Sequence, residues 1–407
     1  MNRWRVGGLS TLVLVVASCG SLTPTPTAPV QTSNSPASTV TPAPTPTATP
    51  TPAPVGPLAT CVSAPAGGTP AAGGFGVIKG SEIEVLSTGG TVLNETSLAG
   101  LGDTVPVWVG VGQAGVYLYT KSTGELSVLG RSGAAQNLGT VTPTGGWNDT
   151  DNISLAESPS GTCWAFSVDS YDANAVATSE LYVGGTGIAP TLLATLTRPN
   201  MLNGVDAGGY QVLRWDTLGV LLGSDPTEVG GAGPFITESY SFGVVVRIDP
   251  QTKAVSAPLC GSGRFADEAP DGTVTCITGL NSDAKIEVTK QGGSTTIIDT
   301  RSESAGEVAF VGGSSLLTYC TSAAGNDTWT ETLLSVRLSG SSPSPTTLIP
   351  SAGPGLLDGV FAWYRLLGTN AIAELQGTYP STSLVEVNLS TGSTATIAAA
   401  DSLLGVL

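Results

Sequence analysis

Beyond residue 70, apolar and polar residues alternate with a period of two, the pattern of half-buried β-strands. Short runs such as Ile83-Glu84-Val85-Leu86 and Val116-Tyr117-Leu118-Tyr119 are rich in β-branched and aromatic side chains. The pattern indicates no amphipathic helix of more than about two turns. We therefore expect this part of the chain to be all-β.

The predicted strands occur as seven hairpins, each broken by a turn that contains Gly, Asn, Ser or Pro. The pairs are 83–86 with 91–93, 116–120 with 125–129, 179–183 with 191–196, 244–249 with 254–259, 284–289 with 294–298, 333–338 with 346–349, and 384–388 with 393–397. A repeat of roughly 40–50 residues with four strands is typical of a β-propeller, whose thin sheets bury their faces against one another. We predict seven blades, with six as the alternative, over residues 61–407. A pair of β-sandwiches would explain the strands but not seven similar hairpins.

The first repeat is short, because only residues 75–78 precede its hairpin. We therefore predict that residues 402–407 return to complete it. Six tryptophans occur at about one per repeat and are expected to pack between blades: Trp108, Trp147, Trp164, Trp215, Trp329 and Trp363.

The amino-terminal residues have the layout of an export signal, with Arg3 and Arg5 ahead of the apolar stretch 6–17. At ~1.5 Å per residue, these twelve residues cover only ~18 Å of a ~30 Å hydrocarbon core, too little for a membrane span. The tetrad Val16-Ala17-Ser18-Cys19 resembles the lipobox of bacterial lipoproteins. The resemblance implies that residues 1–18 are removed and that Cys19 is lipidated. Membrane lipid is then a partner through Cys19, and the protein is expected outside the cytoplasm, at the cell surface or in the periplasm.

Residues 19–60 comprise the lipidated cysteine and a tether. Between residues 21 and 58 there are 11 prolines and 10 threonines. Proline fixes φ and removes a backbone donor, so this segment is expected to be an extended, disordered linker in the polyproline II conformation.

Two turns carry a family resemblance. Ser158-Pro159-Ser160-Gly161 and Ala269-Pro270-Asp271-Gly272 are similar to the Ser-Pro-Asp-Gly turn of TolB-type, WD-repeat-like propeller repeats, with Ser160 where Asp is usual. The resemblance implies the propeller fold. It implies no activity, because this fold carries binders, scaffolds and enzymes alike.

The amino-acid composition limits which catalytic sites, metal sites and partners the chain can have. The 407 residues include 31 acidic and 15 basic side chains and no histidine, with a net charge of −16. The lack of imidazole excludes Ser-His-Asp catalysis, histidine-ligated zinc and histidine proton shuttles. Net negative charge argues against nucleic acid as a partner, since nucleic acid requires a basic patch. No cofactor and no metal site are expected.

Five cysteines follow Cys19: Cys61, Cys163, Cys260, Cys276 and Cys320. An exported chain meets oxidising conditions, so disulfides are allowed, and the odd number leaves at least one thiol. Cys260–Cys276 is the favoured pair, because each residue is expected to end a strand on the same face of neighbouring blades. Cys276–Cys320 competes with it.

Long intervals between hairpins point to a ligand-binding rim. We expect the segments 168–174, 198–203 and 225–240 to meet at one end of the central channel, where propellers usually hold ligands. The candidate ligand-binding residues are Asp169, Tyr171, Asp172, Asn200, Phe235 and Glu238. The acidic runs 148–152 and 169–174 lack the full calcium-loop pattern and are interpreted as polar turns.

Two functions follow from these observations. The first is a binding or scaffolding module for an envelope protein or glycan, with no catalytic residues. The alternative is a polysaccharide-active enzyme that uses paired carboxylates, with Asp216, Asp225, Glu238 and Asp267 as candidates. Two such carboxylates ~5–10 Å apart in a cleft would favour the enzyme.

Overall fold

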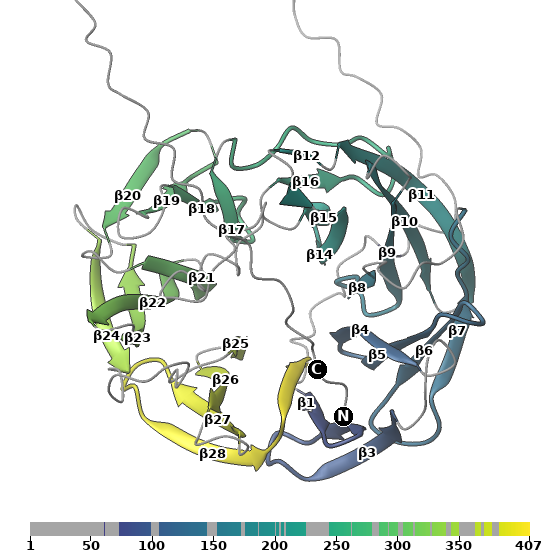
Figure 1. Ribbon diagram of the computed structural model, residues 1–407, viewed down its shortest axis with the longest axis horizontal. Helices are drawn as coiled ribbons and strands as arrows, with labels where there is room; N and C mark the ends of the chain where they lie inside the picture. The colour runs from purple at the N-terminus through teal and green to yellow at the C-terminus, as the bar shows by residue number, and fades with distance from the viewer. Residues whose placement is uncertain are drawn as a thin grey trace, which may run out of the picture. The chain divides into compact units, whose positions relative to one another are not determined.

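The computed structural model describes part of the chain, and every element bounded there is a β-strand (Figure 1). The described residues are 61, 73–98, 106–144, 153–171, 176–185, 187–199, 201–202, 205–206, 209–224, 244–261, 263–278, 285–291, 293–299, 304–311, 314–325, 328–338, 343–349, 363–367, 370–376 and 382–407. The predicted export signal, Cys19 and the tether lie outside them. No helix in the described part of the chain is both long and apolar enough to span a bilayer.

Six sheets have four antiparallel strands, and one has three. Sheet 1 is β29 (Ser402–Val406), β1 (Phe75–Lys79), β2 (Glu82–Leu86) and β3 (Val92–Ser97). Sheet 2 is β4 (Val107–Gly112), β5 (Gly115–Thr120), β6 (Glu125–Leu129) and β7 (Gln136–Thr140). Sheet 3 is β8 (Ile153–Glu157), β9 (Cys163–Tyr171), β10 (Val176–Gly185) and β11 (Ile188–Pro199).

The remaining sheets follow in chain order, after a small hairpin of β12 (Met201–Leu202) and β13 (Val205–Asp206). Sheet 4 is β14 (Tyr210–Asp216), β15 (Gly219–Ser224) and β16 (Val245–Ile248). Sheet 5 is β17 (Arg264–Glu268), β18 (Val274–Thr278), β19 (Lys285–Thr289) and β20 (Thr295–Asp299). Sheet 6 is β21 (Ser304–Val311), β22 (Ser315–Gly325), β23 (Thr328–Arg337) and β24 (Ser344–Ile349). Sheet 7 is β25 (Trp363–Leu367), β26 (Asn370–Gln376), β27 (Thr382–Asn388) and β28 (Thr394–Ala399).

The all-β prediction is confirmed, and six of the seven predicted hairpins are present as paired strands. The prediction of a strand at 254–259 is wrong, because that segment pairs with β16 only through an isolated bridge between Ile248 and Val255 and scattered backbone hydrogen bonds. The Ser256 side chain accepts the Arg247 N–H at 2.9 Å, and Pro258 has no N–H to donate. A regular ladder therefore does not form there.

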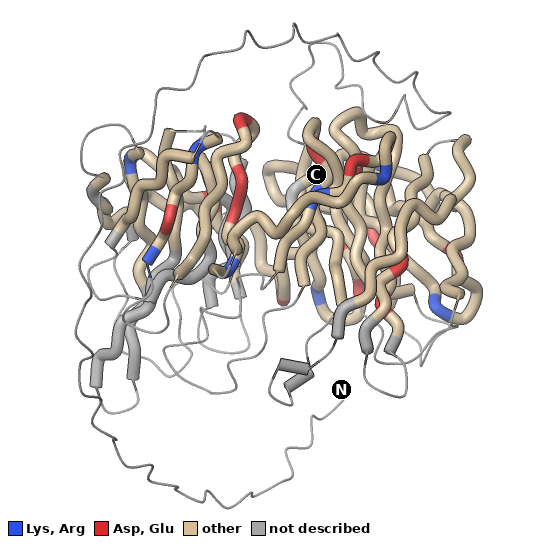
Figure 2. Tube along the Cα trace, turned by 90° about the horizontal axis from the view of Figure 1, so that it is seen from above, with Lys and Arg blue, Asp and Glu red and all other residues tan. Residues whose placement is uncertain are grey.

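Apolar side chains fill the spaces between successive sheets. Separate buried clusters join sheets 1 and 2, 2 and 3, 3 and 4, 4 and 5, 5 and 6, and 7 and 1. Between sheets 7 and 6, Gly392 lies against the backbone carbonyl of Leu348. At the six junctions that hold a buried cluster, the sheets therefore shield their faces against each other, as the alternating pattern requires. Charged positions are sparse along these strands (Figure 2).

The last strand completes the first sheet, as the sequence predicts. β29 pairs with β1, with Phe75 opposite Val406 and Ile78 opposite Ser402. Beyond the ladder, Gly73 N–H donates to the Leu407 carbonyl at 3.0 Å, and Leu407 N–H donates to the Gly74 carbonyl at 2.9 Å. The strand also packs against β4 of sheet 2 and β25 of sheet 7.

The tryptophans divide into two groups. Trp164 and Trp215 lie in the buried clusters between sheets 2 and 3 and between sheets 3 and 4, as expected. Trp108 in β4 is 42% exposed, so the expectation that it packs in an inter-sheet core is wrong. Its strand shifts register between Trp108 and Gly110, and such a bulge redirects side chains. Trp147 and the side chains of Trp329 and Trp363 lie outside the description.

Candidate functional site

Five charged residues meet where sheet 4 adjoins sheet 5. Arg214 and Asp216 belong to β14, Arg247 to β16, and Asp267 and Glu268 to β17. We call this set the charge cluster. Both β14 and β17 lie nearest the centre of the sheet arrangement in their sheets (Figure 1).

Backbone irregularities place two of these side chains. The pairing of β14 with β15 shifts register between Val212 and Arg214, and that of β17 with β18 shifts between Phe265 and Asp267. A bulge re-aims the side chain that follows it. Arg214 and Asp267 each follow such a shift.

The two arginines hold three carboxylates. Arg214 Nε is 3.1 Å from Asp216 Oδ2, and Arg214 Nη1 is 3.0 Å from Asp267 Oδ1. Arg247 Nη1 is 2.7 Å from Asp216 Oδ1, and its Nη2 donates to Glu268 Oε2. The Arg214 side chain is 35% exposed and that of Glu268 only 5%. The cluster therefore runs from solvent into the junction between two sheets.

Burial acts against the ionised form of two of these acids. Desolvation raises the pKa of Asp267, while Arg214 and the Phe310 N–H, 2.8 Å from Oδ2, act in the opposite direction. Desolvation likewise raises the pKa of Glu268 against the attraction of Arg247 and Arg214. The guanidinium groups offset part of the cost of burying these carboxylates.

The charge cluster bears on the carboxylates proposed as a catalytic pair. Asp216 and Asp267 do lie near each other, but both bind Arg214 through its guanidinium group. Asp216 Oδ1 also accepts the Leu218 N–H at 2.8 Å. The carboxylate oxygens of both residues therefore already accept hydrogen bonds from the protein itself. This is typical of a structural ion-pair network rather than of a general acid and base. Asp225 and Glu238 lie outside the described residues.

The predicted rim is largely outside the described residues, as Asp172, Asn200, Phe235 and Glu238 are. Tyr171 is the last residue of β9, and its side chain is not described. Asp169 is only 1% exposed and lies against Gly209, where a β-carbon would overlap its carboxylate. This burial does not match the expected position of Asp169 on an open rim. The acidic run 148–152 also lies outside the description.

Two disulfides are present among the described residues. Cys260 precedes β17 and bonds to Cys276 in β18 of the same sheet, with Cα atoms 5.7 Å apart. This is the pair favoured from the sequence, although the expected placement on neighbouring blades is wrong. Because Cys276 is used here, the competing Cys276–Cys320 pair does not form.

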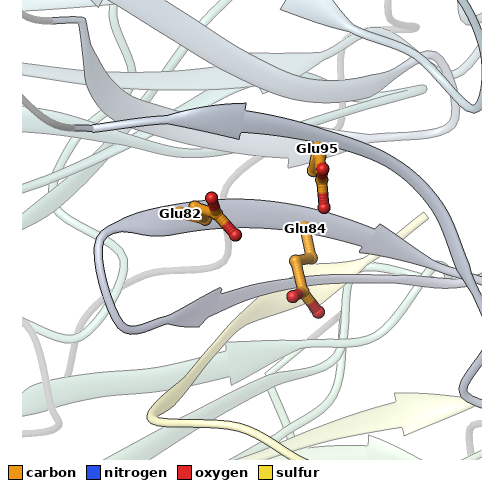
Figure 3. Close-up of side chains that lie close together, drawn as sticks. All are labelled: Glu82, Glu84 and Glu95. Carbon is orange, nitrogen blue, oxygen red and sulfur yellow. The ribbon is translucent and has the colours of Figure 1, made fainter.

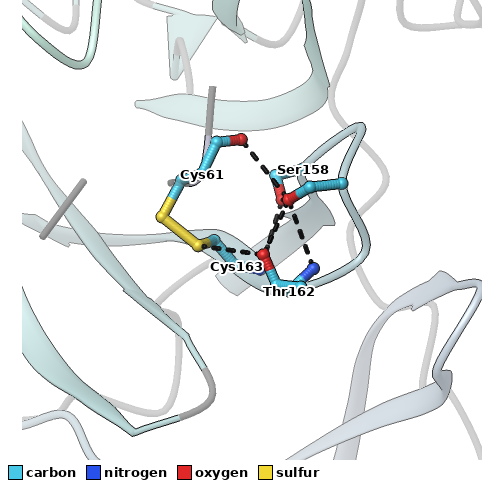
Figure 4. The surroundings of a disulfide bond; sticks show 5 residues. Cys61, Ser158, Thr162 and Cys163 are labelled. Carbon is cyan, nitrogen blue, oxygen red and sulfur yellow. Dashed lines mark hydrogen bonds between the residues drawn. A yellow bond between two sulfur atoms is a disulfide. The ribbon is translucent and has the colours of Figure 1, made fainter. Parts of the chain in front are cut away.

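The second disulfide joins Cys61 to Cys163, residues 102 positions apart (Figure 4). Cys61 is fully buried in the apolar cluster between sheets 3 and 4. The Ser160 hydroxyl, in the turn between β8 and β9, donates to the Cys61 carbonyl at 3.5 Å. The chain ahead of β1 is thus attached to sheet 3, a link that sequence reasoning missed because nothing local to either cysteine indicates it.

Three glutamates gather on sheet 1, where Glu84 and Glu95 are directly opposite across β2 and β3 and Glu82 lies two residues away (Figure 3). One oxygen of each lies within 4.8 Å of the others. The Lys79 ammonium is 3.7 Å from Glu84 Oε1 and partly balances this charge. Oxygen ligands of this kind suit hard cations, but three carboxylates supply fewer ligands than the six to eight that Ca²⁺ takes.

No family model matches the chain, and no curated protein matches it. Among solved structures, a puromycin hydrolase is 12% identical over 83% of this chain, with a TM-score of 0.42. The chain spans 55% of that protein's length. An uncharacterised protein of Listeria monocytogenes EGD-e is 11% identical over 74% of this chain and 86% of its own, with a TM-score of 0.45. A putative 6-phosphogluconolactonase of Bacteroides fragilis NCTC 9343 is 11% identical over 73% of this chain and 95% of its own, with a TM-score of 0.33.

Proposed function

We propose that the chain is a lipid-anchored, extracytoplasmic β-propeller of seven blades that binds or scaffolds an envelope protein or glycan. Sheets 1 to 7 are its blades, with the three-stranded sheet 4 counted as one of them. The TolB-type resemblance of the turns at 158–161 and 269–272 belongs to this proposal. So does the anchor at Cys19.

The order of the sheets supports the propeller. Inner strands of successive sheets contact each other in the pairs β29–β4, β4–β8, β8–β14, β17–β21 and β25–β29. The buried clusters extend this order from sheet 4 to sheet 5. The contact of β29 in sheet 1 with β25 of sheet 7 supports the proposal that the sheets close into a ring.

The main support for the proposed location outside the cytoplasm is the pair of disulfides, Cys61–Cys163 and Cys260–Cys276. Disulfides persist in oxidising compartments and are rare in the cytosol. Their presence supports export, which the charged and apolar layout of residues 1–18 already indicates. A binding role is favoured over the carboxylate enzyme because Asp216 and Asp267 are occupied by Arg214.

Metabolic labelling tests the anchor. The full chain is expressed in a bacterial host with a labelled fatty acid, beside Cys19→Ala and the control Ser18→Ala, which keeps a small residue ahead of the cysteine. We expect label and membrane association in the wild type and in Ser18→Ala, and neither in Cys19→Ala. Equal labelling of Cys19→Ala would overturn the anchor.

Cross-linking in intact cells, followed by mass spectrometry, tests the binding role. An envelope protein or glycan captured by the wild type, and also by the unanchored Cys19→Ala chain when it is added outside the cells, supports the module. Turnover of a polysaccharide that is lost in Asp216→Asn would instead support the enzyme.

A further inference from the structure

Two glutamates occupy the same place in different sheets. Glu157 is the last residue of β8, and Glu268 is the last residue of β17. Each is followed four residues later by a glycine with positive φ, Gly161 at 69° and Gly272 at 80°. In both turns that glycine donates a 2.9 Å hydrogen bond to the carbonyl of the residue after the glutamate. The two carboxyl groups therefore enter equivalent junctions with the preceding sheet.

Arginine neutralises Glu268. Its Oε2 accepts from Arg247 Nη2 and lies 3.7 Å from Arg214 Nη2. Both arginines come from sheet 4, the preceding sheet. A buried carboxylate is tolerated there because cations accompany it.

Glu157 has a different environment. Its Oε2 accepts the Ala114 N–H at 3.2 Å, in the turn between β4 and β5 of the preceding sheet. Gly112 and Gly161 flank the carboxyl group closely enough that a β-carbon at either position would overlap it. Its Oε1 is buried and accepts no hydrogen bond of normal geometry within the described part of the chain, although the Tyr117 hydroxyl and the Gln113 N–H lie near the carboxyl group.

Few charged or titratable groups face Glu157. Sheet 2 presents the Tyr117 hydroxyl and the Gln113 and Ala114 amides to the carboxyl group. Its own sheet contributes the turn from Ser158 to Thr162, which holds no charged residue. No lysine or arginine among the described residues forms an ion pair with Glu157, in contrast to Glu268.

We propose that Glu157 is a proton-dependent latch between sheets 2 and 3: as a neutral acid it fits the closed junction, and its ionisation loosens that junction. An unpartnered buried oxygen costs far less free energy on a neutral carboxyl group than on an anion. At Glu268, by contrast, two arginines offset part of the cost of burying the ionised form. This inference is independent of the ligand and of the lipid anchor.

The electrostatics agree with the geometry. Desolvation raises the pKa of Glu157, and the Ala114, Tyr117 and Gln113 groups offset this only in part. An acid with a raised pKa in the folded state binds its proton more tightly there than in the unfolded chain. Its contribution to stability is therefore fully present below the ordinary glutamate pKa and is lost as pH rises through the raised value.

The test compares urea unfolding of the full chain with that of Glu157→Gln between about pH 4 and pH 8.5. The amide mimics the neutral acid, so the midpoint of Glu157→Gln should exceed that of the wild type at high pH and approach it at low pH. The expected difference is on the order of 0.5 M urea for each unit by which the pKa is raised. The comparison variant Glu268→Gln, which removes one of the two carboxylates beside Arg247, should gain less stability at high pH than Glu157→Gln, because the arginines favour the ionised form of Glu268.

A Glu157→Gln profile that runs parallel to the wild type, or lies below it throughout, would overturn the latch. If that variant does not fold, carbon-13 NMR of glutamate-labelled wild type decides. Two carboxyl resonances should then titrate above the usual glutamate range, and Glu268→Gln should remove one of them. Finding no resonance beyond the one lost in Glu268→Gln also overturns the proposal.

Discussion

Arg214 in β14 and Asp267 in β17 join two neighbouring sheets through a 3.0 Å contact between Nη1 and Oδ1. Asp267 Oδ2 also accepts the Phe310 N–H from β21, so this one carboxylate links three sheets. Because both residues follow a register shift, the contact depends on backbone geometry as much as on charge.

Replacing Arg214 should destabilise this junction. In Arg214→Met, Asp267 and Glu268 lose a cation but remain buried, and we expect a loss of about 2 kcal/mol, since the guanidinium is partly exposed. The loss should shrink at low pH, because the arginine attracts only the ionised carboxylates. Urea unfolding at several pH values measures this. Lys285→Met, at an exposed position in β19, is the control and should change stability little.

The two disulfides should differ in effect and in accessibility. By chain entropy, the 102-residue separation of Cys61–Cys163 contributes about 4.7 kcal/mol, and the 16-residue separation of Cys260–Cys276 about 3 kcal/mol. The double Cys→Ala variant that lacks Cys61–Cys163 should therefore melt at a lower temperature than the one that lacks Cys260–Cys276. As the reductant concentration is raised, Cys260–Cys276 should be reduced first, because Cys61 and Cys163 are at most 1% exposed to solvent. Mass spectrometry after alkylation gives the order, and the reverse order would contradict this assignment.

Deleting residues 402–407 should strongly lower the melting temperature. The deletion removes the strand that pairs with β1 and the buried side chains of Leu403, Leu404 and Leu407. At about 2 kcal/mol for each buried leucine, the loss is roughly 6 kcal/mol. Calorimetry on the full and shortened chains measures it, with Ser402→Ala as the control. An unchanged melting temperature would be inconsistent with the pairing of β29 and β1.

Gly209→Ala should be destabilising by about 1–3 kcal/mol, because its new methyl group would overlap the buried Asp169 carboxylate. Gly187→Ala is a useful comparison, since nothing lies within 4 Å of a β-carbon there, although its φ of 74° adds backbone strain. Denaturation midpoints of the two variants separate the overlap from the strain. No loss of stability in Gly209→Ala would mean that Asp169 moves aside freely.

The hairpins were predictable from the sequence because the signals that specify them lie within the hairpins themselves. Alternation sets which face of a strand is buried, and Gly, Asn and Pro mark the turns, so β5 and β6 appear within a residue of their expected bounds. The return of 402–407 to the first sheet followed from counting strands. The prediction of a strand at 254–259 failed because the Arg247 N–H donates to the Ser256 side chain, which interrupts the regular backbone ladder.

The charge cluster and the long disulfide could not be read from the sequence in this way. Asp216 and Asp267 were candidate catalytic acids in the sequence. Their ion pairs were not predictable, because Arg214 and Asp267 belong to different sheets and are 53 positions apart in the sequence. Cys61 and Cys163 likewise meet in the buried core between sheets 3 and 4, to which no local pattern near either cysteine points. Glu157 and Glu268 each precede one of the two similar turns, and this similarity was visible in the sequence. Their different surroundings were not, because these depend on which residues the preceding sheet supplies.

The pairing of β29 with β1 has a consequence for biogenesis. A chain that crosses a membrane amino-terminus first delivers β1 to β3 early, yet their sheet lacks its inner strand until the final residues emerge. During that interval the backbone edge of β1 and the side chains of Phe75 and Val77 have no cover from β29. If the chain is exported as proposed, its maturation should therefore depend on chaperones that occupy an open strand edge, and a bulky fusion at the carboxyl terminus should delay maturation more than one at the amino terminus.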